Sequence, residues 1–374
     1  MARRARIALT YLTAALLCAM PPDRAEAQVP GSLVLRVLVD LDHQSGSLAE
    51  AAGEEGFWLR RIRLIAQASP APGLAGRVIL DPSALAVGPD GAAPFRGAPL
   101  VEANVDYQVH PSVAVRGGQQ RLPFGLAASA VAPSIPTPEY PLAGRLLMQR
   151  VSAFRDIGVA VLGQAGPVEA GAGIFGGAGI NVRTDNNRAV DLVGRVSLAA
   201  RPEWTVGASG WSGRSGALHR VDGVPRRTFH DDARFVRWGV DTRLVYGPLT
   251  ASVEYLADRT SPNAEAENPT PALEVLRRDG WYAQAALRIL PRLELVGRRD
   301  RWDPRAGRAG DEIVEWTGGF SWYLHEEHQV SHPRRGRPIN FVVRHSRVML
   351  FAEHERPAQG GAGTRLRVRW EAFF

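Results

Sequence analysis

The sequence predicts an all-β protein: a transmembrane antiparallel β-barrel of about sixteen strands that closes on its own C-terminal strand, residues 363–374. Three observations predict this fold. Segments in which apolar and polar residues alternate recur along the chain. Short and long connections between these segments also alternate, and the last segment ends on Phe374.

The N-terminus, residues 1–27, is interpreted as a secretory signal peptide. Arginines within positions 3–6 form a basic start, an apolar run follows, and the triplet Ala-Glu-Ala at 25–27 supplies the small residues that a signal peptidase needs. We therefore expect residues 28–374 to form the barrel. Cys18 raises a lipoprotein interpretation, which the bulky Leu17 before it disfavours.

The composition restricts the function classes. Cys18 is the only cysteine and leaves with the signal, so the mature chain has no disulfide or thiolate chemistry. All 45 basic residues counted as Lys+Arg are arginine. The signal carries four arginines, Asp23 and Glu26, so its removal lowers the formal net charge from +7 to +5. A modest positive field attracts anions. No basic run with interleaved aromatic residues indicates a nucleic-acid partner.

The strand-like segments define the barrel. They are residues 33–41, 57–68, 74–82, 99–109, 112–119, 153–165, 167–176, 189–200, 202–212, 234–247, 248–257, 279–290, 291–300, 312–324, 341–353 and 363–374. Within 99–109, apolar Val101, Ala103 and Val105 share one face and polar residues share the other. Charges along whole polar faces suit a wet lumen, and the apolar faces suit lipid. The segment 341–353 is the least regular, because Arg344 and Arg347 fall on opposite faces.

The connections sort by length. Those after even-numbered segments are mostly tight and carry proline or glycine, whereas those after odd-numbered segments are long, as in 42–56, 83–98, 120–152, 213–233, 258–278 and 301–311. Bacterial outer-membrane barrels place short turns toward the periplasm and long loops outside. A terminal aromatic residue such as Phe374 is read by the barrel-assembly machinery. About sixteen strands leave an aqueous channel, which favours transport.

Four stretches carry a family resemblance. They are FWLRRIRL at 57–64, VEANVDYQVHPSVAVRGGQQRLPFGL at 101–126, RDIGVAVLG at 155–163 and GAGIFGGAG at 171–179. In this order and spacing they resemble the phosphate-selective porin O and P family of the bacterial outer membrane. The resemblance is firm over residues 57–180. The resemblance implies a sixteen-stranded homotrimeric barrel, a long third loop (120–152) folded into the pore, and basic residues that draw anions through it.

Two departures from the family pattern bear on selectivity. Arg121 stands where the family has a lysine, and Gln120 replaces an aromatic residue. The chain has no lysine at all, and arginine binds phosphate in a fixed fork rather than as a mobile point charge. A relay that hands ions onward needs moderate, repeated binding. The resemblance therefore supports an anion preference more than phosphate selectivity.

The candidate pore-lining residues are arginines on the third loop and on the polar faces of three strands. They are Arg61, Arg63, Arg116, Arg121, Arg145, Arg150, Arg365, Arg367 and Arg369. The alternative is that such arginines pair across the lumen with acids such as Glu102, Asp106 and Asp156, which sets a transverse field without selecting one solute.

Enzyme interpretations find little support. His325 and His328 lie at a strand end rather than on a helix, the His230-Asp231-Asp232 run lies in a long loop, and no G-x-S-x-G elbow is present. His345 and Ser346 are expected on opposite faces. We predict no enzyme, cofactor or metal.

The functional hypotheses are three. The first is an outer-membrane porin for small anions, with phosphate or polyphosphate as candidates. The second is a general non-selective porin, and the third is a structural or adhesive barrel without a conducting pore. The expected partners are outer-membrane lipid, small anions and the assembly machinery.

Overall fold

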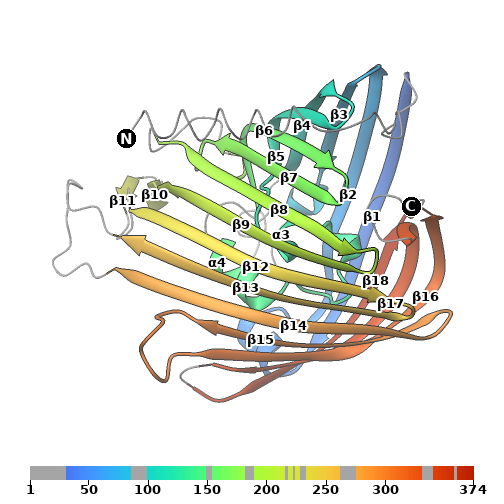
Figure 1. The fold of residues 1–374 in the computed structure, drawn as a ribbon. Helices are drawn as coiled ribbons and strands as arrows, with labels where there is room; N and C mark the ends of the chain where they lie inside the picture. Colours follow the sequence, from blue (N-terminus) through green and yellow to red (C-terminus); the bar gives the residue numbers. More distant parts are fainter. Residues whose placement is uncertain are drawn as a thin grey trace.

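The computed structural model describes residues 31–85, 99–148, 154–181, 189–214, 218–221, 224–227, 233–261, 275–330, 340–357 and 360–374. The interpreted signal peptide lies outside these residues. Within them, sixteen strands form one closed antiparallel barrel, so the predicted fold class is confirmed (Figure 1). The first strand pairs with the last, from Leu38 opposite Phe373 to Ser45 opposite Leu366.

The barrel strands follow one another in chain order around the wall. They are β1 (Ser32–Ser45), β2 (Gly56–Ala71), β3 (Leu74–Leu80), β4 (Leu100–His110), β5 (Val113–Arg121), β6 (Arg155–Ala165), β7 (Val168–Phe175), β8 (Asp191–Arg201), β9 (Trp204–Arg214), β12 (Arg234–Tyr246), β13 (Leu249–Ser261), β14 (Leu276–Leu290), β15 (Leu293–Asp303), β16 (Ile313–Val330), β17 (Asn340–Arg356) and β18 (Gly363–Phe373).

Smaller elements lie in the long connections. They are α2 (Ser47–Ala52), η1 (Pro82–Leu85), α3 (Leu126–Ser129), η2 (Ala132–Ser134), α4 (Leu142–Met148) and the hairpin β10 (Leu218–Val221) with β11 (Val224–Arg227). Figure 1 shows α3 and α4 inside the barrel, between the near and far walls. The sequence did not predict the short helices, since three to seven residues are too few for a helical period to show.

Each predicted strand segment overlaps one barrel strand, with the largest difference at β16. This strand runs to Val330, six residues beyond the predicted end at 324. Its pairing with β17 shifts register between Tyr323 and His325 and again between Glu327 and His328. An extra residue on one strand breaks the alternation of faces. The first shift leaves Leu324 of β16 unpaired and the second leaves Val343 of β17 unpaired, so neither falls between Arg344 and Arg347, which stay on an unbroken stretch of β17.

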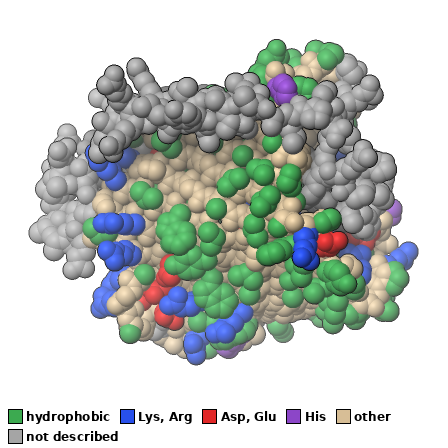
Figure 2. All heavy atoms as spheres, in the orientation of Figure 1, with side chains coloured by type: hydrophobic (Ala, Val, Ile, Leu, Met, Phe, Trp, Pro, Cys, Tyr) green, Lys and Arg blue, Asp and Glu red, His purple; other side chains and the backbone are tan. Residues whose placement is uncertain are grey.

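Aromatic side chains form two bands on the outer surface of β9 and β12–β18. One band includes Trp238, Tyr255, Trp281 and Trp316, and the other includes Trp204, Tyr246, Trp322 and Trp370. Trp238 and Tyr246 lie eight residues apart on β12, which corresponds to roughly 20 Å along the membrane normal for a tilted strand. Figure 2 shows hydrophobic side chains across the middle of one face between more polar edges. Two aromatic bands on either side of an apolar zone are typical of outer-membrane barrels.

The outer surface of β5–β8 differs from the banded wall. Its outward residues are Val, Ile, Leu, Ala and Gly, for example Val115, Val159, Ala172 and Val196. Aromatic residues are absent from the outward positions of these four strands. The barrel thus has one smooth aliphatic wall and one wall with aromatic bands.

Candidate functional site: arginine clusters around the third loop

The third loop, predicted at 120–152, begins after β5 at residue 122, and its described part, residues 122–148, folds into the barrel as predicted. Where it enters, Gly125 takes a φ of 71°, and a Cβ there would lie 2.6 Å from Oε1 of Glu254 on β13. Only glycine fits this approach. The Glu254 carboxylate accepts hydrogen bonds from the backbone N–H groups of Leu126 and Ala127 at 2.6 and 3.1 Å. The loop is therefore fixed to the wall at its first turn.

The far part of the loop is held by arginines of the opposite wall. Arg347 on β17 donates to the carbonyl of Ile135 at 2.9 Å, and Arg369 on β18 donates to that of Pro138 at 2.6 Å. Arg298 on β15 donates to the carbonyl of Glu139 at 2.7 Å. Because buried carbonyls need partners, these bonds fix the path of the loop across the lumen.

The loop also contributes to the largest hydrophobic core. Leu122, Phe124, Leu142 and Leu147 of the loop pack with wall residues that point inward, among them Trp211 of β9. A porin-type lumen is otherwise polar. This packing joins the loop to the β6–β15 side of the barrel in addition to its polar anchors.

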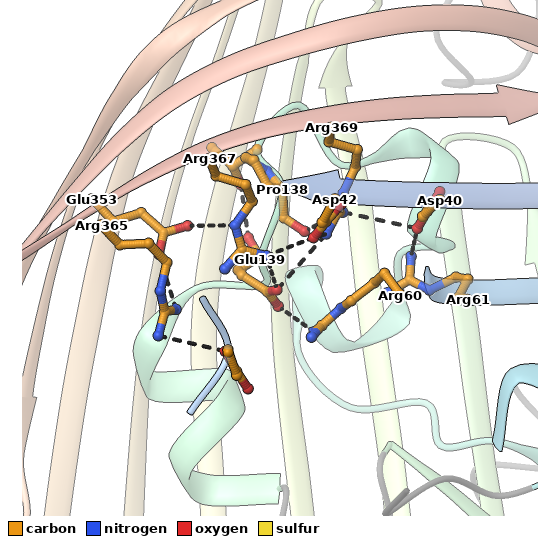
Figure 3. Close-up of polar contacts among 12 residues, drawn as sticks. Asp40, Asp42, Arg60, Arg61, Pro138, Glu139, Glu353, Arg365, Arg367 and Arg369 are labelled. Carbon is orange, nitrogen blue, oxygen red and sulfur yellow. Dashed lines mark hydrogen bonds and ion pairs between the residues drawn. The ribbon is translucent and has the colours of Figure 1, made fainter. Parts of the chain in front are cut away.

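A dense group of ion pairs lies where β18 meets β1. We call it the seam cluster, and Figure 3 shows it. Its centre is Glu139 of the third loop, whose carboxylate lies 2.6 Å from Arg367 and 2.8 Å from Arg60. The cluster comprises the arginines Arg60, Arg61, Arg365, Arg367 and Arg369 and the acids Asp40, Asp42, Glu54, Glu139 and Glu353.

Electrostatics favour the ionised form of Glu139. Burial alone would raise the pKa of this carboxyl, but the charges of Arg60, Arg367 and Arg369 outweigh burial and hold the pKa well below its usual range. With five arginines and five acids, the seam cluster is formally neutral. Its arginines close the barrel and anchor the loop.

Enclosure limits what two of the predicted pore-lining residues can do. Arg367 and Arg369 point into the barrel, as expected, but the side chain of each is only 1% exposed. Arg369 bonds both carboxylate oxygens of Asp42, at 2.6 and 2.7 Å. These guanidinium groups therefore offer no accessible face to a passing ion.

A second group of arginines, the basic cluster, has fewer acids. It comprises Arg63 of β2, Arg77 of β3, Arg121 of β5 and Arg155 of β6, with Asp81 and Glu102. Glu102 alone faces three of the arginines, at 3.0 Å from Arg155, 3.7 Å from Arg77 and 3.9 Å from Arg121. Arg63 lies 3.5 Å from Asp81. Within the part of the chain that the structure describes, Arg63, Arg77 and Arg121 already outnumber Asp81 and Glu102, and Arg155 adds a fourth guanidinium beside Glu102.

The third loop brings Tyr140 to the basic cluster. Its hydroxyl donates to the carbonyl of Ala130 at 3.1 Å. Burial would raise the pKa of the Tyr140 hydroxyl, but the nearby charges of Arg121, Arg155 and Arg63 prevail and lower it below its ordinary value. These three arginines therefore place a positive potential at the Tyr140 hydroxyl.

The other predicted pore-lining arginines that the structure describes either form ion pairs with acids of the wall or hold the third loop. Arg61 lies 2.9 Å from Asp40, Arg116 lies 2.5 Å from Asp106, and Arg365 lies 3.3 Å from Glu353. Arg145 on α4 lies 2.6 Å from Glu315 and holds the loop to β16. Arg150 lies outside the described residues. Glu102 and Asp106 do pair with arginines, but with those of the nearby strands β3, β5 and β6 rather than across the lumen as expected.

Sequence reasoning missed several residues of the site. Arg60, Arg77, Arg155 and Arg298 were not candidates. A register shift between β1 and β2 at Asp40 and Leu41 places Arg60 and Arg61 in one cluster, although alternation puts neighbours on opposite faces. Arg77 sat on a polar face and could have been found from alternation alone.

No metal-binding group is present among the described residues, in the sense of three or more His, Cys, Asp or Glu side chains together. His345 points inward and lies 2.6 Å from Glu371, whereas the Ser346 hydroxyl accepts a hydrogen bond from Trp370, so the two lie on opposite faces as predicted. The described helices are all too short or too polar to cross a membrane.

Comparison with known proteins gives a match in structure only. No family model matches the chain. No curated protein matches it either. Among solved structures it is similar to an anion-selective porin from Comamonas acidovorans, with a TM-score of 0.60 and 12% identity over 92% of this chain and 100% of that chain. It is also similar to OmpT of Vibrio cholerae in its trimer form, with a TM-score of 0.61 and 10% identity over 92% and 100% of the two chains.

A third similar structure is the outer-membrane channel DcaP of Acinetobacter baumannii, with a TM-score of 0.55 and 12% identity over 95% of this chain and 100% of that chain. At such identities a likeness shows the fold alone. The chain has the sixteen-stranded fold of the bacterial outer-membrane porins.

Proposed function

We propose that the protein is an outer-membrane porin through which small anions diffuse passively beside the basic cluster. The observation that carries this proposal is the excess of arginine over acid there. The side chains of Arg63, Arg77 and Arg121 are 16, 30 and 11% exposed, so these cations are accessible to water. Rings or rows of accessible cations at a narrow part of a pore raise the local concentration of anions.

Phosphate and polyphosphate are the candidate solutes within this class. Arginine presents paired N–H donors that match phosphate oxygens, and the sequence motifs resemble those of the phosphate-selective porins. The chain has no lysine, however, and a fixed guanidinium fork holds an oxyanion in one geometry. We therefore propose a preference for anions over cations, with weak discrimination among anions.

The neutral seam cluster favours a second candidate, a general porin without marked selectivity. If the ion pairs of the seam dominate the field of the lumen, their opposite charges cancel along the solute path.

The test is conductance in planar bilayers with reversal potentials in a KCl gradient. The anion proposal predicts a reversal potential of the sign that Cl⁻ preference gives. A potential near zero would support the general porin, a cation-selective potential would contradict both, and the absence of any channel would favour a structural barrel.

We also propose that the chain assembles as a homotrimer through the smooth wall of β5–β8. A wall that faces lipid headgroups carries aromatic bands, whereas this one carries small aliphatic side chains that allow close approach of a neighbouring barrel. OmpT of Vibrio cholerae, of similar fold, is described in a trimer form. A closed threefold ring would hide three such walls around one axis.

Paired substitutions test the location of the contact. Ala172→Trp adds a bulky ring to the smooth wall, and Ala251→Trp adds the same ring to the banded wall. Light scattering after chromatography should give a trimer for the wild type and Ala251→Trp and smaller species for Ala172→Trp. A monomeric wild type, or loss of the trimer only in Ala251→Trp, would contradict the proposal.

A further inference from the structure

An arginine points outward from the apolar wall of the barrel. On β15, Arg298 and Asp300 face the lumen, so Arg299 between them faces outward, and its side chain is exposed. It lies opposite Ala283 of β14 and Trp316 of β16, within the level of the aromatic band that includes Trp281 and Trp316. A charge on the lipid-facing surface of a barrel costs free energy unless it lies near the interface and finds a partner.

Two tryptophans hold Arg299 in place. The guanidinium carbon lies 5.5 Å from the ring centroid of Trp281 and 5.6 Å from that of Trp316, one ring on each neighbouring strand. Both distances are in the range of cation–π contacts. The rings stabilise the cation without neutralising it, so the N–H donors at its edge remain available to an anion.

The next outward arginine on the strand shows what Arg299 lacks. Arg301 lies 2.5 Å from Glu312, 3.3 Å from Asp303 and 3.8 Å from Asp279. Arg299 has no carboxylate within 4.0 Å among the described residues. One of two neighbouring cations is therefore satisfied within the protein, and the other is aimed at the surroundings.

We propose that Arg299, flanked by Trp281 and Trp316, binds a phosphate of a phosphorylated lipid headgroup in the outer leaflet. The abundant anions at this level of a membrane wall are headgroup phosphates, and the planar guanidinium fork fits phosphate oxygens. Beside Arg299 toward the periplasmic side, Gly297 and Gly318 face outward, with no atom within 4 Å of an added Cβ. An acyl chain can lie against the backbone there. This site is independent of what passes through the lumen.

The experiment measures lipid retained by the purified, folded mature protein in native mass spectrometry. The probes are diphosphorylated lipid A and the same lipid with both phosphates removed. The wild type should retain the phosphorylated form preferentially, and Arg299→Gln should weaken that retention about tenfold, as expected for the loss of one charge-assisted hydrogen bond. Equal retention of the two lipids by the wild type would overturn the proposal.

Two controls locate the site and identify its ligand. Arg259→Gln removes the same charge from another exposed outward position, on β13, and should leave retention within about twofold of the wild type. Equal losses in the two variants would refute a site at Arg299. Millimolar inorganic phosphate should not displace the lipid; displacement would mean that the site takes free phosphate instead. Because Arg299 lies outside the lumen, Arg299→Gln should keep the reversal potential of the wild type, which separates this test from that of the pore.

Discussion

The seam cluster and the basic cluster lie in the same lumen and use the same side chain, yet they differ in what surrounds each arginine. The seam holds five arginines with five acids, and its Arg367 and Arg369 are enclosed. The basic cluster holds four arginines with two acids, and three of them are accessible. An arginine on the polar face of a strand is therefore not by itself part of a pore. Pairing and enclosure decide whether it fixes the structure or acts on a solute.

The seam is expected to respond to mutation mainly through stability. Glu139→Gln removes the negative charge that Arg60, Arg367 and Arg369 share. Removing one partner of a buried ion pair lowers the free energy of unfolding by about 3–5 kcal/mol. Thermal unfolding in detergent should show a lower midpoint, and single-channel records should show added noise as the loop loosens.

The matched control for this variant is Glu312→Gln. Glu312 pairs with Arg301 at the surface, where such a pair contributes at most about 1 kcal/mol. Equal midpoints for the two variants would mean that Glu139 does not anchor the loop.

Because the pKa of Glu139 is lowered in the folded state, this carboxylate contributes its full stabilisation of the fold at pH values above the ordinary carboxyl range. That contribution to the free energy of unfolding is lost as the pH falls.

The basic cluster is expected to respond through selectivity, and Tyr140 supplies a pH test. Its pKa is lowered, so at alkaline pH below the usual tyrosine range the hydroxyl ionises and adds a negative charge to the cluster. The anion preference should then decline as the pH rises. In Tyr140→Phe that decline should vanish while the preference at neutral pH stays. A decline of the same size in Tyr140→Phe would assign the titration to another group.

The fold was largely predictable from the sequence, and the site was so only in part. Because each strand has lipid on one side and water on the other, apolar and polar residues alternate along it with a period of two. Each strand could therefore be predicted from its own stretch of sequence. The pairing of Glu139 with Arg367 joins positions 228 residues apart across the lumen, which no local pattern reveals. The register shift beside Arg60 and Arg61 likewise depends on β1 and β2 together. Alternation gave the direction of each arginine but not its partners.

The contrast between the clusters is tested most directly by one pair of variants. Arg121 in the basic cluster and Arg365 in the seam have side chains of similar exposure, 11 and 14%. Reversal potentials in a KCl gradient should show a clearly reduced anion preference for Arg121→Gln and a nearly unchanged one for Arg365→Gln. Equal shifts in the two variants, or a shift only in Arg365→Gln, would contradict the assignment of selectivity to the basic cluster.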